Sequence, residues 1–118
     1  MSSRESLFQS LSKDCIDLQD LQTFHREFDQ EKHFDQDIFR NVAYLSAEIG
    51  ELVSAIRELR KAGDTFEESD ARVHVGEELA DCLAYVVKLA NYSKVDLHEA
   101  YVKKMQHNIE REWHKAVR

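Results

Sequence analysis

The chain has 118 residues, of which 42% are hydrophobic, and it carries a formal net charge of −7, no proline and three glycines. This length fits one domain with a modest core. The composition favours long helices over a turn-rich β-sandwich. The acidic balance argues against a surface for nucleic-acid polymers, because phosphate backbones bind basic stripes.

The chain shows no sign of export or membrane insertion. Its first residues lack the apolar stretch of a signal peptide, and no segment approaches membrane-spanning length. The two cysteines, Cys15 and Cys82, set no disulfide framework, and Cys82 falls on an apolar stripe typical of a core. We therefore expect a single domain over residues 1–118, with 1–16 peripheral, in a reduced, cytoplasmic setting without a membrane partner.

The first predicted helix covers about residues 17–32, and the segment 33–37 then interrupts the pattern. The next helix is the clearest and ends near Ala62, with Gly63 as its C-cap. An apolar row with 4-3 spacing predicts its core face: Ile38, Val42, Leu45, Ile49, Leu52, Ile56 and Leu59. A second row, about 100° around the helix, has the same spacing: Tyr44, Glu48, Glu51 and Ala55.

A third helix is predicted from about residue 67 to 92. Its apolar row consists of Val75, Leu79, Cys82, Val86 and Leu89. The row beside it again holds an acidic pair between uncharged residues: Ala71, His74, Glu78, Asp81 and Tyr85. Glu77 and Lys88 are expected to face solvent.

A fourth helix is predicted over about residues 97–116. Asp96 is a good N-cap, with Glu99 three residues later in an Asp variant of the capping box. One face of this helix carries Lys104, Asn108 and Arg111. The sequence therefore predicts an all-α domain of four principal helices with short connections, similar to a four-helix bundle.

The two acidic pairs point to a metal site. Glu48 with Glu51, and Glu78 with Asp81, are each spaced i,i+3, so each pair shares one helical face. If the two helices pack with these faces opposed, four carboxylates gather where only cations relieve their repulsion. Mg²⁺, with Mn²⁺ as a substitute, is preferred over iron or zinc because no Glu-x-x-His motif accompanies the pairs. The alternative is that both pairs lie on ordinary solvated faces.

The other polar residues are less specific alone. Lys104, Asn108 and Arg111 read as surface residues, but beside a bound divalent ion they would complete a polyphosphate clamp. His25, on the inner side of the first helix, is more often a hydrogen-bonded core histidine than a ligand. His74 is interpreted as a structural partner of one carboxylate.

Taken in order, His25, ExxE, ExxD and the segment KMxxNxxR resemble the all-α nucleoside triphosphate pyrophosphohydrolases of the MazG type. The resemblance runs from about Leu18 to Arg111 and is closest to the dCTP pyrophosphatase branch. That branch also has a histidine followed nine residues later by an aromatic residue, as in His25 and Phe34. The resemblance implies Mg-dependent hydrolysis of a (deoxy)nucleoside triphosphate to the monophosphate and pyrophosphate, in a fold completed by homo-oligomerisation.

The resemblance also implies roles for single residues. Glu48, Glu51, Glu78 and Asp81 would hold metal, and either Glu48 or Glu51 would accept a proton from the attacking water. Lys104, Asn108 and Arg111 would contact phosphates, and His25 and Phe34 the base or sugar. The partners implied are the nucleotide and one or three further copies of the chain, as a homodimer or homotetramer. Nucleotide-pool sanitation is one role that such an activity would serve.

Two positions depart from the branch, which has a tryptophan where this chain has Phe34 and another where it has Glu58. Base selectivity is therefore expected to be looser, and a Glu58 facing the base would favour cytosine or adenine over thymine. The alternative to an enzyme is a non-catalytic helical interaction module, in which the second rows form a dimer seam and the acidic pairs meet lysine or arginine of the partner.

Overall fold

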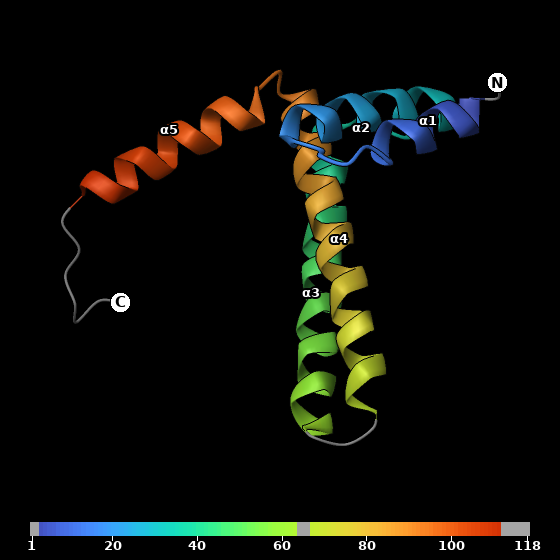
Figure 1. The fold of residues 1–118 in the computed structure, drawn as a ribbon, viewed down its shortest axis with the longest axis vertical. Coiled ribbons are helices and arrows are strands. Elements are labelled where there is room, and N and C mark those ends of the chain that lie inside the picture. The colour runs from blue at the N-terminus through green and yellow to red at the C-terminus, as the bar shows by residue number, and fades with distance from the viewer. Residues whose placement is uncertain (1–2, 64–66, 112–118) are drawn as a thin grey trace.

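The computed structural model describes residues 3–63 and 67–111, and within them all regular structure is helical. The five helices are α1 (Ser3–Leu11), α2 (Leu18–Lys32), α3 (Ile38–Ala62), α4 (Glu68–Tyr92) and α5 (Leu97–Glu110). Figure 1 shows α3 and α4 as a long antiparallel hairpin, with α1 and α2 on one side of its upper end and α5 on the other. The all-α prediction is confirmed, and the peripheral N-terminal segment contains a helix of its own. The predicted extension of the last helix to residue 116 lies outside the described residues.

Capping residues begin and end these helices, at Gly63 and Asp96 as the sequence predicts, and at Asp37 in addition. Asp37 accepts a hydrogen bond from the backbone N–H of Arg40 at 2.9 Å, and Asp96 accepts one from Glu99 N–H at 3.1 Å. Gly63 ends α3 with φ of 54°, a conformation that glycine adopts without a steric cost. A complete capping box, with both reciprocal bonds, begins α2.

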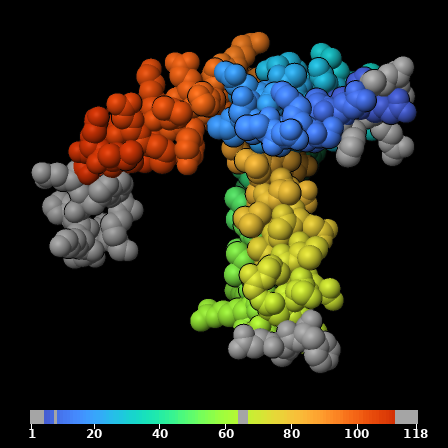
Figure 2. All heavy atoms as spheres, viewed as in Figure 1, coloured from blue at the N-terminus to red at the C-terminus, as the bar shows by residue number. Residues whose placement is uncertain are grey.

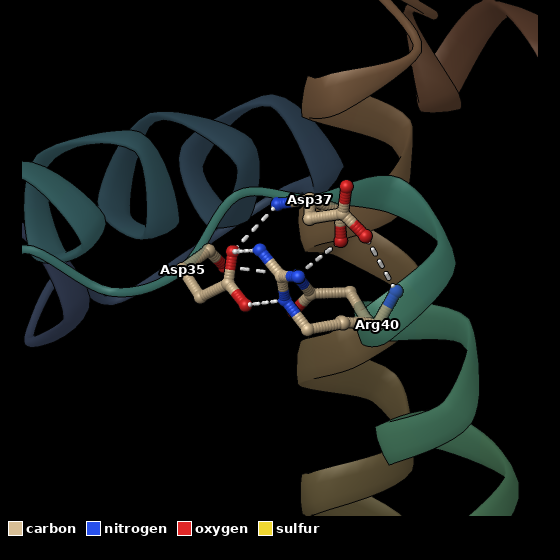
Figure 3. A network of polar contacts seen from close by, with 4 residues as sticks. Asp35, Asp37 and Arg40 are labelled. Atoms are coloured by element: carbon tan, nitrogen blue, oxygen red, sulfur yellow. Dashed lines mark hydrogen bonds and ion pairs between the residues drawn. The ribbon is translucent and has the colours of Figure 1, made fainter.

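A polar network holds the connection between α2 and α3 (Figure 3). The Arg40 guanidinium is paired with the Asp35 carboxylate, which also accepts the N–H of Asp37 at 3.0 Å. Buried Asn41 donates to the carbonyl oxygens of Asp35 at 2.8 Å and Asp37 at 2.7 Å. The segment that carries Phe34 is thereby fixed against the start of α3.

The hairpin packs through the rows that contain the acidic residues. Ala55 is fully buried, Glu78 is 8% exposed, and the Tyr44 and Tyr85 rings lie 6.0 Å apart between centroids. The predicted opposition of the two acidic faces is therefore observed. Small and planar side chains in these rows let the two helices approach closely.

The interpretation of the apolar rows as the core is wrong for much of their length. These row members are between 39% and 52% exposed: Ile38, Val42, Ile49 and Ile56 of α3, and Leu79 and Val86 of α4. The reason is geometric, because a helix that turns its acidic row toward its neighbour turns a row about 100° away from it. Val87, outside the predicted row, is instead fully buried.

The corner between α4 and α5 is built around one buried glutamine. The Gln22 amide donates to Asn91 Oδ1 at 3.0 Å and to the Val95 carbonyl at 2.9 Å. Its oxygen accepts the N–H of Leu97, the first residue of α5, at 2.9 Å. These bonds set the direction in which α5 leaves the hairpin, and α5 packs on α2.

The resulting molecule is open. Its radius of gyration is 17.4 Å, whereas a compact domain of this length has about 13–14 Å. Figure 2 shows the atoms of α5 standing apart from the hairpin. Among the described residues, the buried apolar side chains are those of Leu7, Ala55, Val87 and Ala90. None of the described helices combines the length and apolarity needed to cross a membrane.

Candidate active site

Three carboxylates meet between α3 and α4. Glu48 comes from α3, and Glu78 and Asp81 come from successive turns of α4, with one oxygen of each within 4.8 Å of the others. Glu78 is buried, Glu48 is partly buried and Asp81 is exposed, so the cluster opens to solvent on one side. This arrangement follows from the i,i+3 spacing of the α4 pair and the packing of the two rows.

The chemistry of this cluster fits a hard divalent cation. Glu48 Oε2 and Glu78 Oε2 are buried without a hydrogen-bond partner among the described residues, although such atoms are normally satisfied. Burial, followed by the charges of Glu51 and Asp81, raises the pKa of Glu48 to about 6. Oxygen ligands of this kind are those that Mg²⁺ and Mn²⁺ prefer.

Glu51 stands apart from the three converging carboxylates. Its side chain is exposed, and it is not part of the group whose oxygens lie within 4.8 Å. Its charge nevertheless contributes to the raised pKa of Glu48. The structure thus brings three of the four predicted metal ligands together, with Glu51 one turn farther along α3.

His74 bridges the two helices beside the cluster. Its Nε2 lies 3.3 Å from Glu78 Oε1, and its Nδ1 lies 3.3 Å from Glu58 Oε2. The contact with Glu58 is the main cause of a raised His74 pKa. This geometry agrees with the interpretation of His74 as a structural partner of a carboxylate.

A hollow of about 360 Å³ opens next to Asp81. Besides Asp81, it is lined by His25, Phe28, Phe34, Asp35, Asn41, Tyr44, Ala84, Tyr85 and Lys88. The sequence-predicted residues His25 and Phe34 therefore share one hollow with a member of the acidic cluster. Burial is the main cause of a lowered pKa of His25, which favours its neutral imidazole.

The hollow has aromatic walls. The Phe28 and Phe34 rings meet edge to face, with centroids 5.2 Å apart, and Tyr44 and Tyr85 form the side nearest the cluster. Glu58 lies elsewhere, in a separate hollow with Glu67, Asp70 and His74. Within one chain Glu58 therefore does not face Phe34, and the base preference inferred from it has no support in this geometry.

Lys88 was predicted to face solvent, and this prediction is wrong. Its side chain is 11% exposed, and its Nζ lies 3.2 Å from Oδ1 of Asp29. The ammonium also lies 4.8 Å from the centroid of the Phe34 ring and 5.3 Å from that of Tyr85. The 3-4 spacing of Glu78, Asp81 and Tyr85 extends to Lys88, and this spacing could have indicated that Lys88 shares their inward face.

The α5 residues lie apart from the cluster within one chain. Lys104, Asn108 and Arg111 belong to the arm that Figure 1 shows leading away from the hairpin. Within α5, Asn108 Nδ2 lies 3.9 Å from Met105 Sδ. The structure does not bring these three predicted phosphate ligands to the carboxylates of their own chain.

An all-α hairpin with a carboxylate cluster beside an aromatic hollow has the side chains to hold a divalent cation next to a small aromatic ligand. The family model of the MazG nucleotide pyrophosphohydrolase domain matches residues 36–115, and the chain belongs to this family. The match includes both acidic pairs and the α5 residues, whereas His25 and Phe34 precede it. Comparison with curated proteins finds no match. Membership of the family implies nucleoside triphosphate pyrophosphohydrolase activity.

The raised pKa of Glu48 predicts a pH-dependent stability in metal-free protein. The folded protein holds this proton more tightly than the unfolded chain, so Glu48 stabilises the fold most below pH 4.5 and loses that contribution as the pH rises through 6. The melting temperature of Glu48→Gln minus that of the wild type should therefore increase between pH 4.5 and 7 in EDTA. Exposed Glu77 provides the control, and Glu77→Gln should show a flat difference. A flat difference for Glu48→Gln as well would contradict the assigned environment.

Proposed function

We propose that the protein hydrolyses nucleoside triphosphates to the monophosphate and pyrophosphate with Mg²⁺ as cofactor, and with Mn²⁺ as a substitute. The observation that carries the proposal is the convergence of Glu48, Glu78 and Asp81, together with the aromatic hollow that Asp81 also lines. A nucleotide with its phosphates at the carboxylates would have the hollow beside it for the nucleoside. Removal of unwanted nucleotides from the cellular pool is the role we propose for this activity.

The carboxylates divide into two roles. Glu48, Glu78 and Asp81 would hold the cation, which would supply charge neutralisation of the triphosphate and activation of a water molecule. Glu51 is exposed one turn beyond them and is assigned as the base that accepts a proton from the attacking water. His74 keeps the Glu78 carboxylate in orientation, as partners of metal ligands commonly do.

The nucleoside would enter the hollow, with His25 and Phe34 against the base or sugar. Phe34 offers a smaller stacking face than the tryptophan of the dCTP pyrophosphatase branch. The substrates are therefore proposed to be deoxynucleoside triphosphates as a class, with looser base selectivity than in that branch. The cytoplasm, where such nucleotides are found, is the proposed location.

The phosphate clamp is proposed to come from a second copy of the chain. The half-exposed rows of α3 and α4 form an apolar surface of a kind that usually marks an interface. The arm α5 leaves the hairpin in a direction fixed by Gln22, so it is free to reach a partner. In a homodimer or homotetramer, the partner copy would bring its own Lys104, Asn108 and Arg111 to the carboxylates.

Product analysis tests the reaction. Incubation of the wild type with deoxynucleoside triphosphates and Mg²⁺ should give monophosphate and pyrophosphate by ³¹P NMR. Glu78→Gln should lose activity at least a hundredfold because it removes a buried metal-binding charge while keeping the side-chain volume, whereas Glu77→Gln should stay within about twofold of the wild type. Orthophosphate and nucleoside diphosphate as primary products would contradict the reaction.

A mixed oligomer tests the shared site. Glu78→Gln and Lys104→Ala should each be impaired alone, but a heterodimer of the two contains one intact site if α5 acts on its partner. Co-expression with two different tags and tandem purification should yield a heterodimer with about half of the wild-type activity per dimer, because one of its two symmetric sites is intact. If each α5 serves its own chain, both sites stay defective and no activity returns.

A further inference from the structure

Lys88 and Asp29 form a buried ion pair that the proposed reaction does not use. Asp29 is 2% exposed, its Oδ1 lies 3.2 Å from Lys88 Nζ, and its Oδ2 accepts a hydrogen bond from Tyr92 Oη at 2.5 Å. Burying two charges costs several kcal/mol per ion unless the geometry repays it. A buried pair of this kind is therefore not an incidental surface ion pair, and it calls for a structural or functional explanation.

The ammonium of Lys88 has donors to spare. It carries three N–H groups, and its 3.2 Å contact with Asp29 Oδ1 is an ion pair in which that oxygen accepts no hydrogen bond from the described residues. The faces of Phe34 and Tyr85 lie beside it, at 4.8 Å and 5.3 Å from the ring centroids, and its charge also acts on Asp35 and His25, which line the same hollow. Both rings line the hollow, so a cation with unused donors forms part of its wall.

Lys88 lies at the end of the hollow opposite the carboxylates. Asp81, Tyr85 and Lys88 stand on successive turns of one face of α4, and seven residues of helix span about 10 Å. Phe34, the stacking residue proposed for the base, is at the Lys88 end. A nucleotide with its phosphates at Asp81 would thus have its base, and not its phosphates, next to Lys88.

We infer that Lys88 is a specificity-determining residue that donates a hydrogen bond to a carbonyl oxygen of the nucleobase stacked on Phe34. This inference rests on the proposed function. An ammonium group donates and never accepts, so it favours bases with a carbonyl oxygen at the edge it faces. Cytosine, guanine and thymine have one, whereas adenine has an amino donor in place of the guanine carbonyl and accepts only through ring nitrogens.

Asp29, Tyr92 and the α2–α3 connection are the positioning elements of this contact. Asp29 receives Lys88 and Tyr92 from α4, so it ties α2 to the wall of the hollow. The network of Asp35, Asp37 and Arg40 seen in Figure 3 fixes the segment on the other side of Phe34. The ammonium and the stacking ring are therefore held in place before a nucleotide binds.

The test is a base panel with a charge-neutral double variant. Lys88→Met alone would leave Asp29 buried without its counter-ion, so Asp29→Asn/Lys88→Met is compared with Asp29→Asn, which keeps the ammonium, and circular dichroism checks that both fold. For dCTP, dGTP and dTTP, kcat/KM should fall about ten- to a hundredfold, whereas for dATP it should change less than about threefold. Inhibition by inorganic pyrophosphate should be unchanged. Lys61→Met, at an exposed position near the end of α3, is the control and should behave as wild type.

Two outcomes overturn the inference. An equal fall in kcat/KM for all four nucleotides, with weaker pyrophosphate inhibition, would assign Lys88 to a phosphate. Unchanged kinetics would leave it only a counter-ion to Asp29.

Calorimetric titration of the four deoxynucleoside monophosphates separates this inference from the proposed reaction. A wild type that binds dCMP, dGMP or dTMP through Lys88 without hydrolysing triphosphates would keep the inference and refute the reaction. Pyrophosphate release with a base ranking that the Lys88 substitution does not change would keep the proposed reaction and refute the inference.

Discussion

The structure depends on the packing of two acidic helical rows against each other. In the hairpin of α3 and α4, the apolar side chains that would ordinarily fill such an interface lie to the side, and carboxylates take their place. Burial and the neighbouring like charges raise the pKa of Glu48, and such an arrangement destabilises the fold in the absence of a cation. In the function we propose, the same carboxylates would hold a divalent ion at the phosphates of the substrate, which explains why the chain keeps this destabilising arrangement.

The openness of the chain is a consequence of that packing. Because the acidic rows face inward, the apolar rows of both helices face outward and remain half exposed. The Gln22 corner then sends α5 away from the hairpin rather than over these rows. An oligomer that covers the apolar rows and receives α5 would resolve both features with one interface, which is why we connect the phosphate clamp to a second copy.

The sequence predicted the local structure well and the packing less well. Most helix bounds, the caps at Gly63 and Asp96, and the shared face of Glu78 and Asp81 are determined by short-range chemistry that a sequence displays directly. Periodicity shows which residues share a face, but it does not show which face turns inward. The apolar rows were therefore assigned to a core that the single chain does not build.

Lys88 escaped prediction for a different reason. A lone lysine is usually exposed, and its burial depends on Asp29, which lies 59 positions earlier in the sequence (88 − 29) on another helix. Only the tertiary structure brings the two together. The position of Glu58 beside His74, away from Phe34, is likewise a long-range fact that neither spacing nor composition contains.

The central claim is that the opposed carboxylates bind a divalent cation, and calorimetric titration of the purified protein with Mn²⁺ tests it most directly. The account predicts saturable binding at neutral pH that tightens in the presence of a non-hydrolysable deoxynucleoside triphosphate and is lost in Glu48→Gln and Glu78→Gln. Absence of saturable binding in the wild type, with or without the nucleotide, would contradict the account and favour a helical interaction module whose acidic rows pair with cationic side chains of a partner.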